Sequence, residues 1–245
     1  MISKRPRQAI PFIALALFAG ATQSLRAQTQ WGGGAYGVAE YDTKHTILLL
    51  GGLSVGPGGL GLKPRIGVQG YYLAFDVANT RQTGYVAKPF IGVVNNYNGG
   101  EVGGSIGYAF SNNTIRDVGT GTALTTDTGE GVVVSAGWEE WGTGGGSPLG
   151  YQALASYNFK TQGLWTRGRV TTRLSQVVGT QQQIRVGPEV AYLNGKDYWG
   201  VQPGAIVQFY DRQGRILGLG AGAKFFQGNT NAAYVKVEGY LPLFR

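Results

Sequence analysis

The chain has 245 residues, enough for one substantial domain or two small ones. Only 14% of the residues are charged, 42% are hydrophobic and 43 are glycine, a balance that excludes a disordered chain and favours β-structure. The formal net charge is +8, and the absence of cysteine excludes disulfides, thiolate metal sites and thiol nucleophiles.

Residues 1–27 have the features of a cleavable signal peptide. The basic head MISKRPRQ precedes 13 mostly apolar residues, AIPFIALALFAGA, which are too few for a membrane-spanning helix. Cleavage is expected after Ala21 or Ala27. This segment holds four basic residues and no acids, so residues 28–245 hold 17 basic and 13 acidic residues, a net charge of +4. Most of the basicity therefore belongs to targeting, and no nucleic-acid partner is expected.

Beyond this segment, apolar and polar residues alternate with period two, which predicts β-strands. Twelve such segments follow one another, separated by clusters of Gly, Asn, Asp and Pro. In chain order they are 32–42, 45–54, 62–76, 83–95, 101–110, 130–141, 150–160, 163–176, 182–194, 199–210, 215–226 and 232–244. The first two alternate poorly. One long break, 111–130, is expected to be a loop, on the outer side if the chain begins in the periplasm.

Two architectures bury one face of so many strands: a soluble sandwich, with its apolar face inside, and a membrane barrel, with its apolar face toward lipid. The signal peptide, the even strand number and the long strands favour the barrel. Aromatic residues at the segment ends also favour it, as anchors at the membrane interface: Trp31, Tyr41, Trp138, Trp141, Tyr151, Phe159, Trp165, Tyr192, Trp199, Phe209 and Phe225. We therefore expect an all-β fold, a single antiparallel transmembrane β-barrel of about 12 strands over residues 28–245, in outer-membrane lipid.

The stretch LWTRGRVTTRL places Arg167, Arg169 and Arg173 on one face and apolar or small residues on the other. A lipid-facing strand keeps arginines only on its lumen side. The next segment places Arg185 and Glu189 on the same side. A turn centred near position 179 predicts that Arg169 lies opposite Glu189, and Arg173 opposite Arg185.

The second of these pairs is repulsive, so it needs an acid from elsewhere or an anion. Glu101 and Glu139 are the candidate acids, and Lys88 is a further candidate member of the network. One interpretation is a polar plug of paired charges that fills a modest barrel. The other is a basic constriction that selects anions or guides a polar polymer. The ligand-binding candidates are therefore Arg167, Arg169, Arg173, Arg185 and Glu189.

Glycines on the predicted lumen faces have two readings as well. They allow the sheet to curve, or they leave room for long side chains or for a solute. These glycines are Gly103, Gly107, Gly218, Gly220 and Gly222.

The sequence offers little for catalysis. The single histidine, His45, lies beside the second segment, and Ser54, Ser105 and Ser135 lack the surroundings of a nucleophile motif. No metal-ligand spacing or phosphate-binding motif occurs, so no cofactor is expected. A barrel hydrolase that acts on lipid through His45 remains the enzymatic alternative.

Residues 163–207 contain a Trp-x-Arg-x-Arg strand, a Gly-Pro-Glu segment, a Gly/Asn turn with a nearby aromatic residue, and a further strand with glycine. The residues of this pattern are Trp165, Arg167, Arg169, Gly187, Pro188, Glu189, Asn194, Gly195, Tyr198 and Gly204. The pattern, which covers about a fifth of the chain, resembles that of the cellulose biosynthesis protein BcsS family.

The resemblance implies an outer-membrane barrel associated with bacterial cellulose synthesis, with polysaccharide or accessory factors of the synthesis machinery as partners. The residues and the resemblance together predict a non-enzymatic outer-membrane protein of exopolysaccharide production or export. The alternative from the charge pattern is a small anion-selective porin.

Overall fold

The structure is a computed structural model, and it describes residues 31–77, 79–140, 148–176, 182–196, 198–227 and 231–243. Within these ranges the chain forms twelve strands, one for each predicted segment. They are β1 (Trp31–Asp42), β2 (Ile47–Pro57), β3 (Gly61–Val77), β4 (Thr80–Tyr97), β5 (Gly100–Asp117), β6 (Ala123–Glu140), β7 (Leu149–Asn158), β8 (Gly163–Gln176), β9 (Gln183–Asn194), β10 (Trp199–Tyr210), β11 (Ile216–Phe226) and β12 (Ala232–Pro242). No helix in these ranges has the length and apolar character needed to cross a membrane.

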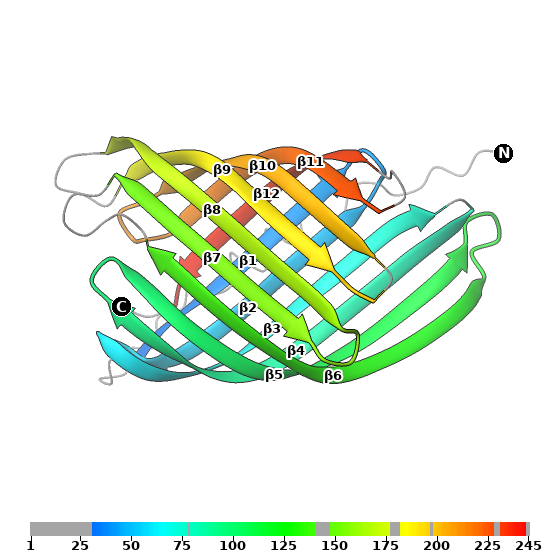
Figure 1. The fold of residues 1–245 in the computed structure, drawn as a ribbon, viewed down its shortest axis with the longest axis horizontal. Helices are drawn as coiled ribbons and strands as arrows, with labels where there is room; N and C mark the ends of the chain where they lie inside the picture. The colour runs from blue at the N-terminus through cyan, green and yellow to red at the C-terminus, as the bar shows by residue number, and fades with distance from the viewer. Residues whose placement is uncertain are drawn as a thin grey trace.

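The strands close into one antiparallel barrel in which sequence neighbours are also spatial neighbours (Figure 1). β1 pairs with β2 on one side and with β12 on the other, where Glu40 lies opposite Lys236 and Tyr36 opposite Tyr240. Closure removes the two sheet edges that would otherwise leave unpaired backbone groups in hydrocarbon. The predicted signal peptide, residues 1–27, lies outside the described residues, as does Trp141.

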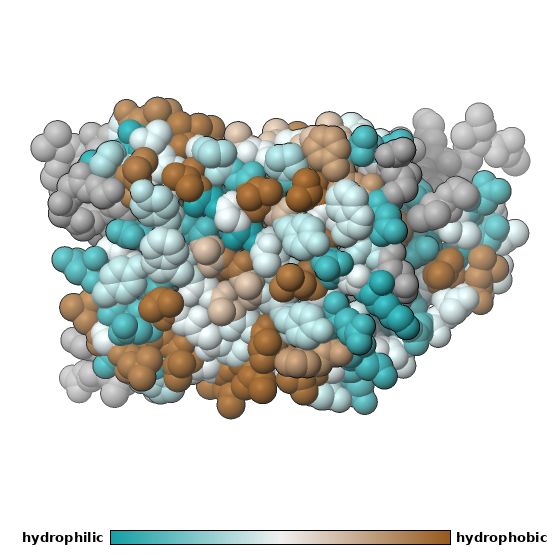
Figure 2. Space-filling model, in the orientation of Figure 1, coloured by the Kyte–Doolittle hydropathy of each residue, from teal (hydrophilic) through white to brown (hydrophobic). Residues whose placement is uncertain are grey.

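The outer face of the barrel is apolar and the inner face is polar. Exposed side chains such as Ile106, Leu219 and Val235 point outward, whereas charged residues such as Arg169 and Glu189 are buried inside. Figure 2 shows apolar side chains over the middle of the visible face, with hydrophilic ones toward the end where β5 and β6 project. A soluble sandwich has the opposite arrangement, so the predicted membrane barrel is confirmed.

Four consecutive strands are longer than the rest. β3 has 17 residues and β4, β5 and β6 have 18 each, whereas the others have 10 to 14. The expected long loop at 111–130 is therefore wrong. β5 and β6 pair through most of it, with Asn113 opposite Asp127, and only residues 118–122 form a turn. The segment is polar on both faces, so it lacks the hydrophobic alternation by which strands are recognised.

The two poorly patterned segments form regular strands, and some of their glycines lie against aromatic side chains of neighbouring strands. A Cβ at Gly52 of β2 would lie 2.8 Å from the ring of Tyr36 on β1, and a Cβ at Gly34 would clash with Tyr240 on β12. At these glycines, a side chain of the adjacent strand thus covers the inner face of the sheet. Hydrophobic alternation within a single strand does not show this contribution.

Candidate functional site

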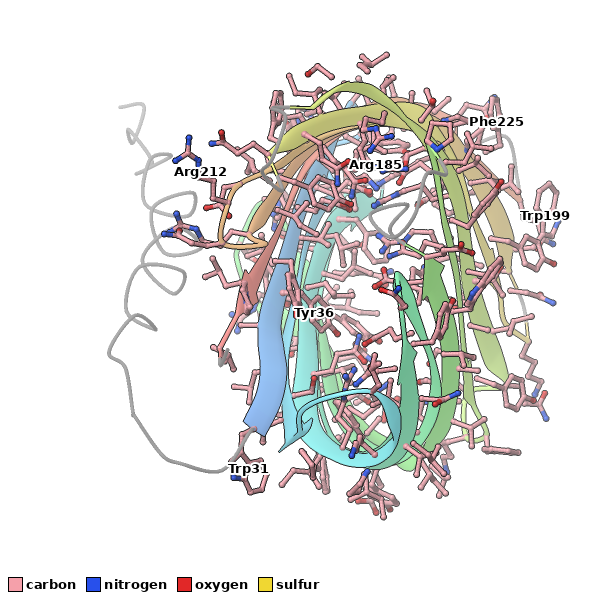
Figure 3. All side chains as sticks on the ribbon, turned by 90° about the vertical axis from the view of Figure 1, so that its left-hand side faces the viewer. Trp31, Tyr36, Arg185, Trp199, Arg212 and Phe225 are labelled. Atoms are coloured by element: carbon pink, nitrogen blue, oxygen red, sulfur yellow. The ribbon has the colours of Figure 1, made fainter. Side chains whose placement is uncertain are left out.

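β8 directs its arginines into the lumen, as predicted. Arg167 and Arg169 share the inner face with Trp165, whose cross-strand neighbours are Ser156 on β7 and Leu193 on β9. Trp165 is therefore not a lipid-interface anchor, and the prediction for this residue is wrong. Because the inner face of β8 holds the odd positions, Trp165 has the same orientation as the arginines, and the Arg167 guanidinium lies 5.9 Å from its ring centroid. Trp31, Trp199 and Phe225 point away from the barrel (Figure 3).

The predicted register between β8 and β9 is confirmed. Arg169 lies opposite Glu189 and Arg173 opposite Arg185. The Arg169 guanidinium donates to Glu189 at 2.9 Å, and both residues are only 6% exposed. The predicted ion pair is therefore a buried one.

Two residues of β12, which the sequence pattern alone did not assign to it, complete this group. Glu238 accepts from Arg169 at 2.7 Å and from Arg167 at 3.5 Å, while Lys236 forms an ion pair with Glu189. We call this group the lumen cluster: Arg167, Arg169, Glu189, Lys236 and Glu238. Three cations thus share two carboxylates, supplied by β8, β9 and β12.

A second buried group lies on the same side of the barrel. Lys224 of β11 forms ion pairs with Glu40 at 2.6 Å and Asp42 at 2.8 Å, both from β1. Long-range pairs of this kind depend on closure of the barrel between β1 and β12. The alternation of β11 and β12 could have placed Lys224 and Lys236 in the lumen, but their partners lie on strands distant in sequence.

The lumen glycines of β11 make room for the long side chains of β12. A Cβ at Gly218 would lie 2.6 Å from the Glu238 side chain, and one at Gly220 would lie 2.8 Å from that of Lys236. At Gly218 and Gly220, glycine therefore provides space for long side chains, which is one of the two roles expected from the sequence.

Arg185 is fully buried, and the acceptors of its hydrogen bonds include neutral oxygens of side chains and backbone. It donates to the Thr171 hydroxyl at 3.1 Å, to the Gln183 side-chain oxygen at 3.3 Å and to the Pro148 carbonyl at 3.0 Å. Figure 3 shows it inside the barrel. Gly150 allows this position, since a Cβ there would lie 2.7 Å from the guanidinium. Arg173 lies directly opposite on β8, so the predicted cross-strand pairing of two like charges is confirmed.

The acids proposed as partners for that pair have other contacts. Glu101 binds Arg65 of β3 at 3.2 Å, and Glu139 accepts from the side-chain amide of Gln152. Lys88 does not join the lumen cluster through any ion pair of the described residues; its ammonium donates to Ser135 on β6 at 3.2 Å.

His45 lies in the turn between β1 and β2, with a positive φ of 63°, and its Nδ1 is 2.6 Å from the Tyr41 hydroxyl. Ser54 lies nine residues further along β2, roughly 30 Å away at the rise of a strand. Ser105 and Ser135 face each other across β5 and β6 on the inner face. The structure therefore does not bring His45 together with Ser54.

No family model and no curated protein matches the chain. Among solved structures, the translocator domain of the autotransporter NalP from Neisseria meningitidis is similar over 96% of this chain and 95% of that chain, with 12% identity and a TM-score of 0.51. The β domain of the Bordetella autotransporter Brka is similar over 86% and 98%, with 13% identity and a TM-score of 0.47. The KdgM porin is similar over 84% and 97%, with 13% identity and a TM-score of 0.43.

The chain is an outer-membrane β-barrel. The likeness to the NalP translocator domain shows the fold, and the apolar exterior with a charged interior gives the lipid-facing side. In this outer-membrane barrel, the wall formed by β8 to β12 and β1 holds the lumen cluster and the Lys224 group. These paired charges support the polar-plug interpretation on that side of the lumen.

Proposed function

We propose that this barrel acts, without catalysis, in the production or export of an exopolysaccharide, cellulose foremost, at the outer membrane. The proposal rests on the resemblance of residues 163–207 to the cellulose biosynthesis protein BcsS family. Three residues of that pattern lie close together: Arg169 binds Glu189, and Gly204 leaves room for Tyr234, whose hydroxyl is 3.4 Å from Glu189.

The observation that carries the proposal furthest is a tryptophan inside the barrel. Trp165 lies on the inner face beside Arg167, whose side chain is 16% exposed. An aromatic ring offers a sugar an apolar face, and a guanidinium donates to its hydroxyls. We assign Trp165 and Arg167 to contact with the polymer.

The test is deletion of the gene in its own bacterium, with cellulose measured outside the cell. Deletion is expected to lower the secreted cellulose, and the wild-type gene to restore it. Trp165→Ala is expected to restore little, whereas Trp199→Ala, which removes a lipid-facing tryptophan, restores it fully. Both variants must first show heat-modifiable migration, which reports a folded barrel. Unchanged cellulose output in the deletion strain would overturn the proposal.

A small anion-selective porin is the second candidate, and the Arg173–Arg185 pair favours it. Arg173 and Arg185 lie opposite each other on the lumen side of β8 and β9 and place two positive charges close together there. A porin of this kind would give planar-bilayer currents whose anion preference falls when both arginines are replaced by glutamine. Currents without ion preference would count against it.

A further inference from the structure

Lys88 of β4 is a buried cation for which the described residues provide no acid. It is 8% exposed, and its ammonium has one hydrogen bond, to the Ser135 hydroxyl at 3.2 Å. The other two buried lysines, Lys224 and Lys236, each contact two carboxylates. Burying a charge without a counter-charge is costly, and an ionisable residue at membrane depth is a functional-site hypothesis by default.

The surroundings of Lys88 form a line of donors across three strands. The side chain crosses β5 over Gly107, where a Cβ would lie 3.0 Å from the lysine stem. Ser135 then donates to Ser156 on β7 at 3.1 Å. An ammonium has three N–H groups, so two remain for a ligand. The hydroxyl hydrogen of Ser156 also lacks an acceptor within the described ranges.

Small residues occupy some of the inner positions beside this line. Ser105 faces Ser135 across β5 and β6, and Gly92 faces Ser105 across β4 and β5. The nearest row also contains Arg65, but its guanidinium is held by Glu101 at 3.2 Å. The arginine in this row therefore already has its counter-ion.

We propose that Lys88, Ser135 and Ser156 form an anion-binding site in the lumen that takes a carboxylate or phosphate group. The ammonium supplies the charge and its two unused N–H groups, and Ser156 supplies a hydroxyl donor. Such charge-assisted hydrogen bonds are about twice as strong as neutral ones. The site lies on the β4–β7 wall, apart from the lumen cluster on β8, β9 and β12.

This site does not depend on the proposed role in exopolysaccharide production. The site lies beside the proposed polymer contact, since Ser156 lies opposite Trp165 on β8. An acidic substituent on a sugar and a phosphate group present the same oxygen acceptors. The experiment below separates these two sources.

The test is isothermal titration calorimetry on the full barrel folded in detergent at neutral pH, with inorganic phosphate, sodium glucuronate and, as neutral control, glucose. At least one anion is expected to give saturable heat, and glucose none. Lys88→Met is expected to weaken anion binding at least about tenfold, and Ser135→Ala several-fold, by the usual strength of hydrogen bonds to charged groups. The anion that binds identifies the source.

The matched control is Lys63→Met, which removes a partly exposed lysine on the same inner face of β3 as Arg65 and is expected to leave binding unchanged. Heat-modifiable migration checks that every variant folds. If Lys88→Met does not fold, the Ser135→Ala variant and the comparison of anions with glucose decide. Absence of saturable heat with both anions, equal binding by Lys88→Met, or an equal loss in Lys63→Met would overturn the site. Cellulose output plays no part in these readouts.

Discussion

Arg169 is the residue on which the lumen cluster depends, because it binds both Glu189 and Glu238. Replacing it with methionine leaves two buried carboxylates to share Lys236 and Arg167. These two cations still balance the two carboxylates, so what is lost are the hydrogen bonds of Arg169, and a hydrogen bond to a charged group contributes about 1.5–3 kcal/mol. We expect Arg169→Met to lower the free energy of unfolding by that amount, measured by urea titration of the barrel in lipid vesicles.

The control for this prediction is Arg81→Gln. Arg81 pairs with Asp76 at 3.0 Å, but both side chains are more than a third exposed. Exposed pairs contribute at most about 1 kcal/mol. Equal losses in the two variants would contradict the view that burial gives the cluster its importance.

Asp211, in the turn between β10 and β11, gives the barrel a local pH dependence outside the membrane. Partial burial opposes ionisation, but the backbone N–H groups of Arg215 and Gln213 and the Arg215 side chain outweigh it and hold the pKa of Asp211 below its usual value. A lowered pKa means that the carboxylate stabilises the turn above the ordinary Asp value of about 3.9, and that this contribution is lost as the pH falls through the lowered pKa.

At pH values below the lowered pKa of Asp211, we therefore expect the hydrogen-exchange protection factors of the Gln213 and Arg215 amides to decrease. Asp211→Asn keeps an oxygen acceptor but cannot titrate, so its protection is expected to be independent of pH in this range. A pH-dependent loss of equal size in the asparagine variant would show that another group is responsible.

At the same scale, local pattern predicts pairs within a hairpin but not pairs across the closure. Arg169 and Glu189 could be paired from the sequence because alternation fixes their face and the turn fixes their register. Glu238 lies 69 residues beyond Arg169. To predict that Glu238 binds Arg169, one must know how far β12 lies from β8 around the barrel. Neither residue alternation nor the turn residues give this distance.

At the scale of elements, β8 and β9 are held in close approach by Gly187. A Cβ at this position would clash with the Val170 carbonyl, which belongs to the backbone of β8 and cannot rotate away. We expect Gly187→Ala to separate the two strands locally and to reduce the fraction of heat-modifiable, folded protein.

Gly168→Ala is the matched control, since a Cβ there would meet only the Val190 side chain at 3.9 Å, an ordinary contact. It is expected to fold like the wild type. If both alanine variants fold equally well, the close approach of the backbones is not what selects glycine at position 187.

The extensions of β5 and β6 show where element prediction fails. In the membrane part, Val102 and Ile106 alternate with small residues, and the strand is recognised from the sequence. Beyond Phe110, both faces carry Asn, Thr or Asp, so only pairing with the neighbouring strand maintains the extended conformation. Period-two alternation arises because one face of a strand is in an apolar environment and the other in a polar one. A strand with solvent on both faces therefore shows no such alternation.

For the molecule as a whole, the apolar exterior makes a prediction about depth. Ile106 faces outward at the middle of the apolar stretch of β5 and is 50% exposed. A lysine at the bilayer midplane of such a barrel costs about 2–4 kcal/mol. We expect Ile106→Lys to lower the free energy of unfolding in lipid vesicles by that amount.

Thr126→Lys, on the exposed extension of β6, provides the comparison and is expected to change stability little. Both substitutions add one lysine to the same sheet, so they differ in distance from the hydrocarbon. A midplane cost no larger than the cost at Thr126 would mean that hydrocarbon does not surround the barrel at this level.

Because the strands differ in length, one side of the barrel is taller than the opposite side. At the rim that carries the β3–β4 and β5–β6 turns, the threonine-rich ends of β3 to β6 extend beyond the shorter strands β7 to β12 on the opposite side (Figure 1). A large body that approaches this rim along the barrel axis contacts the extension of β3 to β6 before it reaches the ends of β7 to β12. The asymmetry gives the molecule a direction within the plane of the membrane as well as across it.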